Sequence, residues 1–387
     1  MPSHSPSPTA TRSSAATAAA PEPKQRIPLA AIPTPHVRID PKVVADNIER
    51  MASYARQHNL RLRPHAKTHK TLRAAEMQLA AGACGLTVAK PSEAEVMAAV
   101  CDDLLVAYPI VQPTAAARLA ALAASGTKIT VAIDSPEAAE VLASAGAAHG
   151  IRFDLLIDVN LGNGRTGMGD VEAVARLAEK IAHSEGVAFA GLFFFPGDLM
   201  GPPETQEEGF KRHATRLGEF RQRLLDAGFE VRVVSGGSTP TGKQSHFNAL
   251  LTEIRPGTYI YNDRMCVTGG HATFEQCAAR IITTVVSNAV EGQVVVDAGS
   301  KTLTSDGAHH VDGFGHVLEY PEAIVRRLSE EHGMIDVSRC DSVPRIGERL
   351  TIIPNHICPV INLMDVTYWV EGDEAVAEPV AARGCIW

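Results

Sequence analysis

RPHAKTHK, residues 63–70, closes the first candidate strand of the chain, 61–67. From there to about Val267, short apolar runs alternate with Ala- and Leu-rich segments of helical periodicity, which is typical of βα units. The further candidate strands are 85–90, 104–110, 128–134, 153–161, 189–197, 231–237 and 252–260, and helical runs include 92–100, 113–124, 136–149, 171–183 and 207–227. Because about eight units fit one closed barrel, we predict a (β/α)8 TIM-type barrel over 41–267. No GxGxxG opens a helix after the first strand, which counts against a Rossmann domain.

A second unit with a different pattern follows at about Thr268. Its β-rich segments, 280–286, 293–298, 349–353 and 366–370, are separated by Gly and Asp turns. We predict a mostly β domain over 268–387, joined by the extended segment 32–40, with ordered structure beginning near Ile32. Residues 1–26 are rich in Ser, Thr, Ala and Pro and predict a disordered tail, with an organelle transit peptide as the alternative.

Composition excludes several classes of partner. The net charge of −8 and scattered Lys and Arg residues offer no basic patch for nucleic acid, and no apolar run is long enough to cross a membrane. Seven cysteines without CxxC pairs are expected to be reduced. These features favour a cytoplasmic protein that binds a small metabolite.

Lys67 is the first candidate for chemistry, because barrel enzymes build their sites at the carboxyl ends of the strands. A desolvated lysine beside other cationic groups has a lowered pKa, as Schiff-base chemistry requires. A basic strand end that faces solvent is the alternative. Two later stretches offer polar groups at equivalent places: DVNLGNGRTG, 158–167, after the fifth strand and SGGSTPT, 235–241, after the seventh. Hydroxyls and backbone N–H groups of the second could hold a phosphate.

PNHICP, residues 354–359, places an imidazole and a thiol at i and i+2. On an extended segment these two side chains share one face and could share an ion. From the residues alone, a buried His beside a buried Cys is the commoner arrangement.

The PHAKTHK segment resembles the cofactor-lysine motif of the D-threonine aldolase and D-serine dehydratase family, whose members have the alanine-racemase-like barrel. The similarity covers Ile32 to Trp387. It implies that Lys67 forms a Schiff base with pyridoxal phosphate and that Arg165 faces the phenolate oxygen of the cofactor. It further implies that Arg255, in EIRPGTYIY at 253–261, lies near the pyridine nitrogen. The remaining cofactor-binding residues implied are His65, Ser238, Thr239, Gly257, Thr258 and Tyr259.

The resemblance also implies that His356 and Cys358 hold a divalent ion. A thiolate ligand favours zinc, with Mn²⁺ or Mg²⁺ as alternatives. The stretch 330–333, Glu-Glu-His-Gly, resembles a family segment that supports the metal site from behind its ligands. One aldolase subgroup carries a His base after the sixth strand, whereas this chain has FFPGDLMG at 194–201, so Asp198 is the candidate replacement.

The function implied is a lyase that eliminates the 3-hydroxyl of D-serine- or D-threonine-type substrates to give a 2-oxo acid and ammonia. Retro-aldol cleavage to glycine and an aldehyde is the alternative; an amino-acid racemase and a non-catalytic pyridoxal-phosphate carrier are further ones. The His-x-Cys pair argues for a lyase, and the length beyond the eighth strand argues against the carrier. By resemblance we expect a homodimer.

Overall fold

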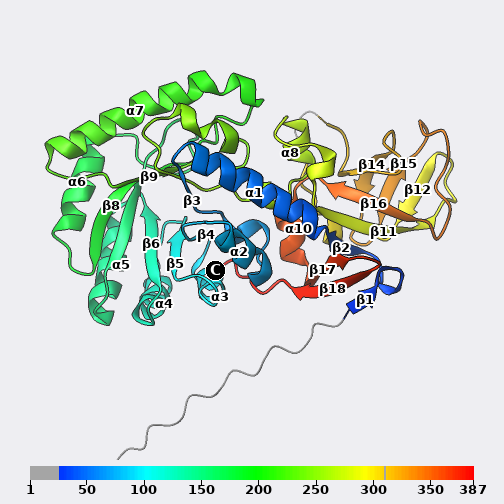
Figure 1. Cartoon of the computed structure of the whole chain (residues 1–387), viewed down its shortest axis with the longest axis horizontal. Coiled ribbons are helices and arrows are strands. Elements are labelled where there is room, and N and C mark those ends of the chain that lie inside the picture. Colours follow the sequence, from blue (N-terminus) through cyan, green and yellow to red (C-terminus); the bar gives the residue numbers. More distant parts are fainter. Residues whose placement is uncertain (1–25, 309–310) are drawn as a thin grey trace, which may run out of the picture.

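The computed structural model describes residues 26–308 and 311–387. They form a helix-covered barrel followed by a large mixed β-sheet, which lie at opposite ends of the molecule in Figure 1. In Figure 1, α8 and α10 lie between the two, and the long helix α1 runs across the barrel toward them. The predicted tail, apart from Arg26, lies outside the described residues.

Eight parallel strands build the barrel, in the order β3-β10-β9-β8-β7-β6-β5-β4. A bridge between His65 and Thr87 joins the first strand to the last and closes the ring. The strands are β3 Arg61–Leu62, β4 Leu86–Val88, β5 Asp103–Val106, β6 Lys128–Ile133, β7 Phe153–Asp158, β8 Val187–Phe193, β9 Val233–Gly236 and β10 Glu253–Ile254. The predicted TIM-type barrel is confirmed.

Helices follow the strands and begin at recognisable signals. Asp40 caps α1 by accepting from the N–H groups of Lys42 and Val43, and Ser135 caps α5, which ends at Gly150 with a φ of 63°. The barrel helices are α1 Pro41–Gln57, α2 Leu72–Ala80, α3 Pro91–Met97, α4 Pro113–Ala124, α5 Pro136–His149, α6 Val171–Ala182 and α7 Glu207–Asp226. Short helices α8 Arg264–Thr268, α9 Ser300–Leu303 and α10 Ile357–Leu363 come later.

Several strands are shorter than the sequence predicts. The candidate strand 61–67 is a regular strand only over β3, with one isolated bridge at His65, and 252–260 is a regular strand only over β10; in both, a 3-10 turn follows, Ala66–Thr68 and Thr258–Ile260. Pro64 and Pro256 explain this, because proline has no N–H to donate to a ladder. The consequence is that Lys67 and Thr258 lie on turns at the barrel mouth.

The second sheet has ten strands and is mainly antiparallel. Strand β2, from the amino-terminal segment, lies between β11 and β17. Strand β1 pairs with β18, so ordered structure begins earlier than the predicted Ile32. The strands are β1 Arg26–Pro28, β2 His36–Ile39, β11 Ala279–Ser287, β12 Gln293–Val296, β13 Gly315–Val317, β14 Ile324–Leu328, β15 Gly333–Asp336, β16 Arg349–Pro354, β17 Val366–Glu371 and β18 Glu374–Pro379.

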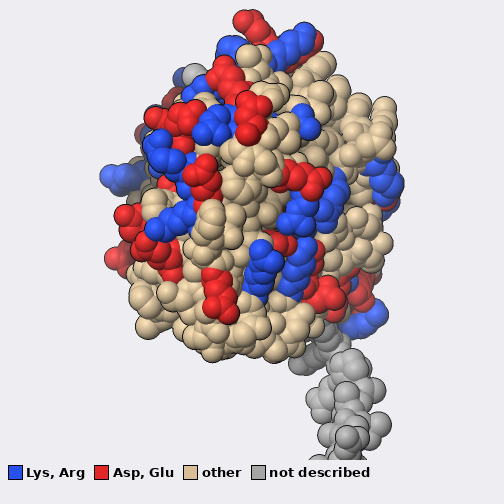
Figure 2. Space-filling view, turned by 90° about the vertical axis from the view of Figure 1, so that its left-hand side faces the viewer, with Lys and Arg blue, Asp and Glu red and all other residues tan. Residues whose placement is uncertain are grey.

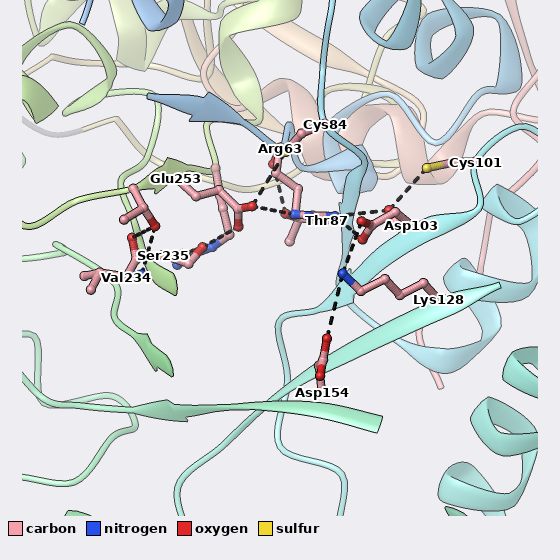
Figure 3. A network of polar contacts seen from close by, with 12 residues as sticks. Arg63, Cys84, Thr87, Cys101, Asp103, Lys128, Asp154, Val234, Ser235 and Glu253 are labelled. Carbon is pink, nitrogen blue, oxygen red and sulfur yellow. Dashed lines mark hydrogen bonds and ion pairs between the residues drawn. The ribbon is translucent and has the colours of Figure 1, made fainter. Parts of the chain in front are cut away.

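A buried polar network supports the barrel floor (Figure 3). Arg63 on the β3 side contacts Glu253 of β10 at 2.8 Å and Asp103 of β5 at 2.7 Å. Ser235 donates to Glu253 at 2.7 Å and accepts from Arg255 at 2.7 Å. Because buried charges are costly unless paired, this chain of contacts fixes Arg255 where the strands end.

Basic and acidic side chains are interspersed on the face of the molecule shown in Figure 2. This face carries no large patch of one charge. None of the helices in the described residues is both long and apolar enough to span a bilayer.

Candidate active site

A cavity of about 1080 Å³ opens at the carboxyl ends of the barrel strands. Residues from after β3, β4 and β5, from the ends of β7 and β8, and from after β9 and β10 line it, and α8 and the start of α10 close the opposite side. Ligand pockets usually measure about 300–1,000 Å³, so this one has room for a cofactor and a small substrate together.

Ten of the residues predicted from the sequence line this cavity. They are His65, Lys67, Arg165, Ser238, Thr239, Arg255, Gly257, Thr258, His356 and Cys358. Asp198 and Tyr259 do not line it.

The Lys67 turn is held by His65, whose Nδ1 accepts from the backbone N–H of Lys67 at 3.4 Å. Burial, together with the charges of Lys67 and Arg255, lowers the pKa of His65 well below its usual value. His65 is therefore a neutral ring in the cavity wall next to the lysine.

The loops after β9 and β10 form a phosphate-sized cradle. The hydrogen bonds found among the described residues leave the backbone N–H groups of Thr239 and Gly257 without an acceptor. Gly257 allows a close approach here, because an added Cβ would lie 3.0 Å from Thr68 Oγ1 and 3.3 Å from His65 Cβ, and these neighbours would have to shift. Unpaired N–H groups beside the hydroxyls of Ser238 and Thr258 are donors suited to a phosphate.

Two arginines face the cavity in different states. Arg255 is buried, donates to Phe194 O at 2.7 Å and lies 3.7 Å from the centre of the Phe193 ring. Arg165 is exposed, and its guanidinium lies 4.4 Å from the centre of the Phe195 ring. Arg255 is thus a fixed part of the wall, whereas Arg165 is free to meet an anion.

His356 and Cys358 converge on the cavity, but the prediction that they share an extended segment is wrong. His356 is extended, with φ −135° and ψ 111°, while Cys358 lies in the first turn of α10. Cys358 Sγ contacts Thr68 Oγ1 at 3.1 Å, and His356 Nδ1 lies 2.7 Å from Asp306 Oδ2. Asp306 thereby orients the ring, as carboxylates do for metal-bound histidines.

Burial lowers the pKa of His356, but its contacts with Cys358, Asp263 and Asp306 raise it to about 9, so the pair must release a proton when it binds an ion. Burial raises the pKa of the Cys358 thiol, but the His356 ring and the Lys67 ammonium lower it more, and the net shift is downward. A thiolate with an imidazole is a donor set for zinc. Among the residues that the structure describes, no third His, Cys, Asp or Glu joins them in a cluster.

Asp198 does not line the cavity. Its carboxylate meets His213 Nε2 at 3.0 Å, and Gly162 packs so closely that an added Cβ would lie 3.1 Å from Asp198 Oδ2. The Asp198 side chain therefore faces α7 and not the cavity. His213, which the sequence did not single out, is its partner.

Tyr259 also faces elsewhere than predicted. Its hydroxyl accepts from Gln78 Nε2 at 3.0 Å behind the cradle, and its backbone N–H donates to Thr239 Oγ1 at 3.0 Å. Tyr259 therefore contributes to the cradle only by orienting the Thr239 side chain.

The stretch 330–333 does not lie at the cavity. It forms the turn between β14 and β15, where Glu330 and Glu331 contact Lys301 at 2.8 and 2.9 Å. The predicted support of the metal pair comes from Asp306 instead.

The sequence did not single out several polar residues that line the cavity, among them Asp158, Asp263 and His271. Asp158 ends β7 and is the first residue of the stretch 158–167 discussed above. Asp263 is recognisable as the cap of α8, since it accepts from Cys266 N at 2.9 Å. It also accepts from Ile357 N at 3.1 Å, which ties α8 to α10. No local pattern marks His271.

We expect the stability of the protein to depend on pH through the buried carboxyl group of Asp158. Burial raises its pKa from 3.8 to about 6, although Thr166 and Arg255 oppose the shift. The folded protein thus binds this proton more tightly than the unfolded chain does. The resulting contribution to folding stability is present at low pH and is lost as pH rises through about 6. We expect Asp158→Asn to stabilise the protein by ~1–3 kcal/mol at pH 8 and to change little at pH 4.

Denaturant unfolding of both proteins in the same cofactor state, from pH 4 to pH 8, measures this difference. A stability difference that stays constant over this range would show that Asp158 does not titrate there.

With this geometry in view, comparison with known proteins identifies the family. A family model described as alanine racemase, N-terminal domain, matches residues 39–265. The chain belongs to this alanine racemase family. A model of a serine dehydratase domain matches residues 278–370 of the same chain. The predicted resemblance is therefore confirmed, and the family implies pyridoxal phosphate as the cofactor.

Similar family members are lyases of two kinds. D-threonine aldolase of Arthrobacter sp is 31% identical over 87% of this chain and 89% of its own length. The crystal structure of D-threonine aldolase from Filomicrobium marinum has a TM-score of 0.86 at 31% identity and covers 95% of this chain and 100% of that one. A cysteine-to-alanine mutant of D-threo-3-hydroxyaspartate dehydratase, in the metal-free form, has a TM-score of 0.85 at 27% identity, covering 91% and 98%. The predicted lyase class is confirmed.

Proposed function

We propose that the chain is a pyridoxal-phosphate- and metal-dependent lyase that eliminates the 3-hydroxyl of small D-3-hydroxy amino acids, giving a 2-oxo acid and ammonia. One observation carries this: Lys67 and the His356–Cys358 pair line the same cavity. An amine able to bind the cofactor thus faces a donor pair able to hold an ion.

The cavity suits the cofactor along its whole length. Thr239 and Gly257 would donate backbone N–H groups to the phosphate, and the neutral ring of His65 would lie against the pyridine. Arg255, fixed by Ser235 and Phe194, would keep the pyridine nitrogen unprotonated. When bound, pyridoxal phosphate supplies an electron sink for the carbon whose proton is removed.

Side chains of the cavity would supply the proton transfer, the anion binding and the metal ligands. Lys67 Nζ would hold the cofactor and would take the proton from C2 of the substrate. Arg165 lies over Phe195 and would hold the substrate carboxylate or the phenolate oxygen of the cofactor. His356 and Cys358 would hold the ion, which supplies Lewis acidity at an oxygen. Zinc is the first choice, with Mn²⁺ or Mg²⁺ as alternatives.

Elimination is favoured over retro-aldol cleavage because cleavage needs a base on the 3-hydroxyl. Asp198, the only base that the sequence offered, is turned toward His213. The similar D-threo-3-hydroxyaspartate dehydratase supports the metal pair rather than the choice of reaction, because its metal-free form was solved with a cysteine replaced by alanine, and Cys358 belongs to the donor pair here. A homodimer stays a prediction.

Retro-aldol cleavage is the second candidate, and His271 is the observation that favours it. This histidine lines the cavity, and burial lowers its pKa, so the ring is neutral and able to accept a proton. If cleavage is the reaction, His271 is the residue to take the hydroxyl proton.

Ammonia release tests the proposal. Purified enzyme with pyridoxal phosphate and zinc is expected to release ammonia from D-threonine and D-serine but not from the L-enantiomers. Chelation should abolish the release, and a divalent ion should restore it. Undiminished ammonia release by enzyme shown to be metal-free would contradict the role of the ion.

A further inference from the structure

Lys70, three residues after Lys67, is a buried lysine that has no part in the proposed chemistry. We propose that Lys70 is a positioning residue, which fastens the turn that carries Lys67 to Glu93 and to the segment 380–387. In this way it holds the Lys67 amine in its working position in the cavity. This inference rests on the proposed function, because that function makes Lys67 the residue that holds the cofactor.

The backbone at Lys70 closes the Lys67 turn. Ala66 O accepts from the N–H groups of His69 at 3.1 Å and of Lys70 at 2.8 Å. Lys70 has a φ of 53°, in the left-handed region that glycine adopts more readily than residues with a Cβ. A lysine at this position therefore indicates that its side chain makes contacts that glycine could not supply.

The Lys70 ammonium has three acceptors for its three N–H groups. Nζ lies 2.9 Å from Glu93 Oε1, and it donates to Ala382 O at 3.2 Å and to Cys385 O at 3.3 Å. The side chains of Lys70 and Glu93 are 6% and 0% exposed. Because a buried charge is costly unless it is paired, the two groups hold each other in place. The ion pair therefore fixes the end of the Lys67 turn.

Glu93 connects this ion pair to the cavity wall after β4. Its Oε2 accepts from Ala89 N at 2.6 Å, and Ala89 lines the cavity. The connection lies at the seam of the barrel, where β3 and β4 are joined by one isolated bridge and, in the described part of the chain, by no ladder. Lys70 and Glu93 thus hold the two sides of this seam together.

The segment 380–387 is the third member of the arrangement. Ala382 N donates to Lys70 O at 2.9 Å, so Lys70 contacts this segment through both its backbone and its side chain. Farther along the segment, Ser92 Oγ donates to Trp387 O at 2.5 Å. Ser92 belongs to α3, which also carries the acid paired with Lys70, and the end of the chain lies next to α3 in Figure 1. Helix α3 and the segment therefore grip the Lys67 turn from two sides.

A firmly held turn matters because the position of the Lys67 amine decides the rates of the steps in which it takes part. A reacting group displaced by about 1 Å can lose about 100-fold in rate. Loss of the Lys70 contacts should therefore slow these steps while the cofactor stays linked to Lys67.

Two variants remove the contacts in different ways. Lys70→Met removes the ammonium and keeps a side chain of similar length, but it leaves Glu93 buried without its partner. The double variant Lys70→Met/Glu93→Gln removes both charges, and the amide oxygen can still accept from Ala89 N. Lys180→Met removes an ion-paired lysine on the outside of the barrel and is the matched control.

Turnover per linked cofactor separates positioning from stability. In both Lys70 variants, kcat for ammonia release from D-threonine, per mole of borohydride-reducible cofactor, should fall at least about tenfold, and KM should stay within about threefold of the wild-type value. Lys180→Met should match the wild-type enzyme. Wild-type kcat per linked cofactor in both Lys70 variants, accompanied only by a lower melting temperature, would overturn the inference and leave Lys70 a purely structural residue.

Exchange with D-alanine tests the inference without the lyase reaction. In this exchange the amine of D-alanine takes the place of the Lys67 amine on the cofactor, and the Lys67 amine is set free. The accompanying change in visible absorbance should be at least about tenfold slower in both Lys70 variants. Slower exchange in these variants, with no ammonia released from any D-3-hydroxy amino acid by the wild-type enzyme, would contradict the proposed function and support the inference. Ammonia release by the wild-type enzyme, with exchange and turnover unchanged in the variants, would overturn the inference and leave the function standing.

Discussion

Lys67→Ala is expected to abolish the covalent attachment of pyridoxal phosphate and to lower the lyase activity at least about 1,000-fold. Lys67 lines the cavity on a turn held by His65, between the cradle and the His356–Cys358 pair. Removing its amine removes both the attachment point and the group that takes the C2 proton. The visible absorbance of the lysine-linked cofactor should disappear as well.

Borohydride reduction followed by mass spectrometry checks the attachment independently of activity. Lys243→Ala, an exposed lysine outside the main cavity, is the matched control and should keep a reducible link. A reducible link that persists in Lys67→Ala would assign the cofactor to another lysine.

Cys358→Ala is expected to lower turnover by about 1,000-fold while the cofactor absorbance stays intact. A bound ion that acts as a Lewis acid contributes several kcal/mol to the transition state, and ~4 kcal/mol corresponds to this factor. The thiol lies at the cavity wall against Thr68 and is removed without disturbing the Lys67 amine. Metal content of the purified variant should fall with the activity.

Cys340→Ala is the matched control, since this cysteine lies after β15 and does not line the cavity. It should retain both metal and turnover. A Cys358→Ala protein with full metal content and full turnover would contradict the assignment of the ion to this pair.

Much of the barrel could be predicted because its signals are local. The helix Pro136–His149 has the bounds that the periodicity predicts. Strand lengths were overestimated where Pro64 and Pro256 interrupt pairing, although the missing N–H groups are visible in the sequence. The helix after His356 was not predicted, although Pro359 in its first turn is compatible with a helix start.

The rest depends on contacts between distant segments. Tyr259 faces Gln78, 181 residues away, and β1 pairs with β18, at the other end of the chain. The direction of Asp198 follows from Gly162 and His213, which no local pattern connects to it. Sequence motifs thus placed ten of the twelve candidate site residues at the cavity, whereas the directions of Asp198 and Tyr259 required the fold.

The carbon products formed from D-threonine test the central claim most directly. Chromatographic analysis of a reaction with holoenzyme and zinc is predicted to find 2-oxobutyrate in amounts equal to the ammonia released. Glycine with acetaldehyde in place of 2-oxobutyrate would contradict elimination and assign the retro-aldol reaction to this cavity.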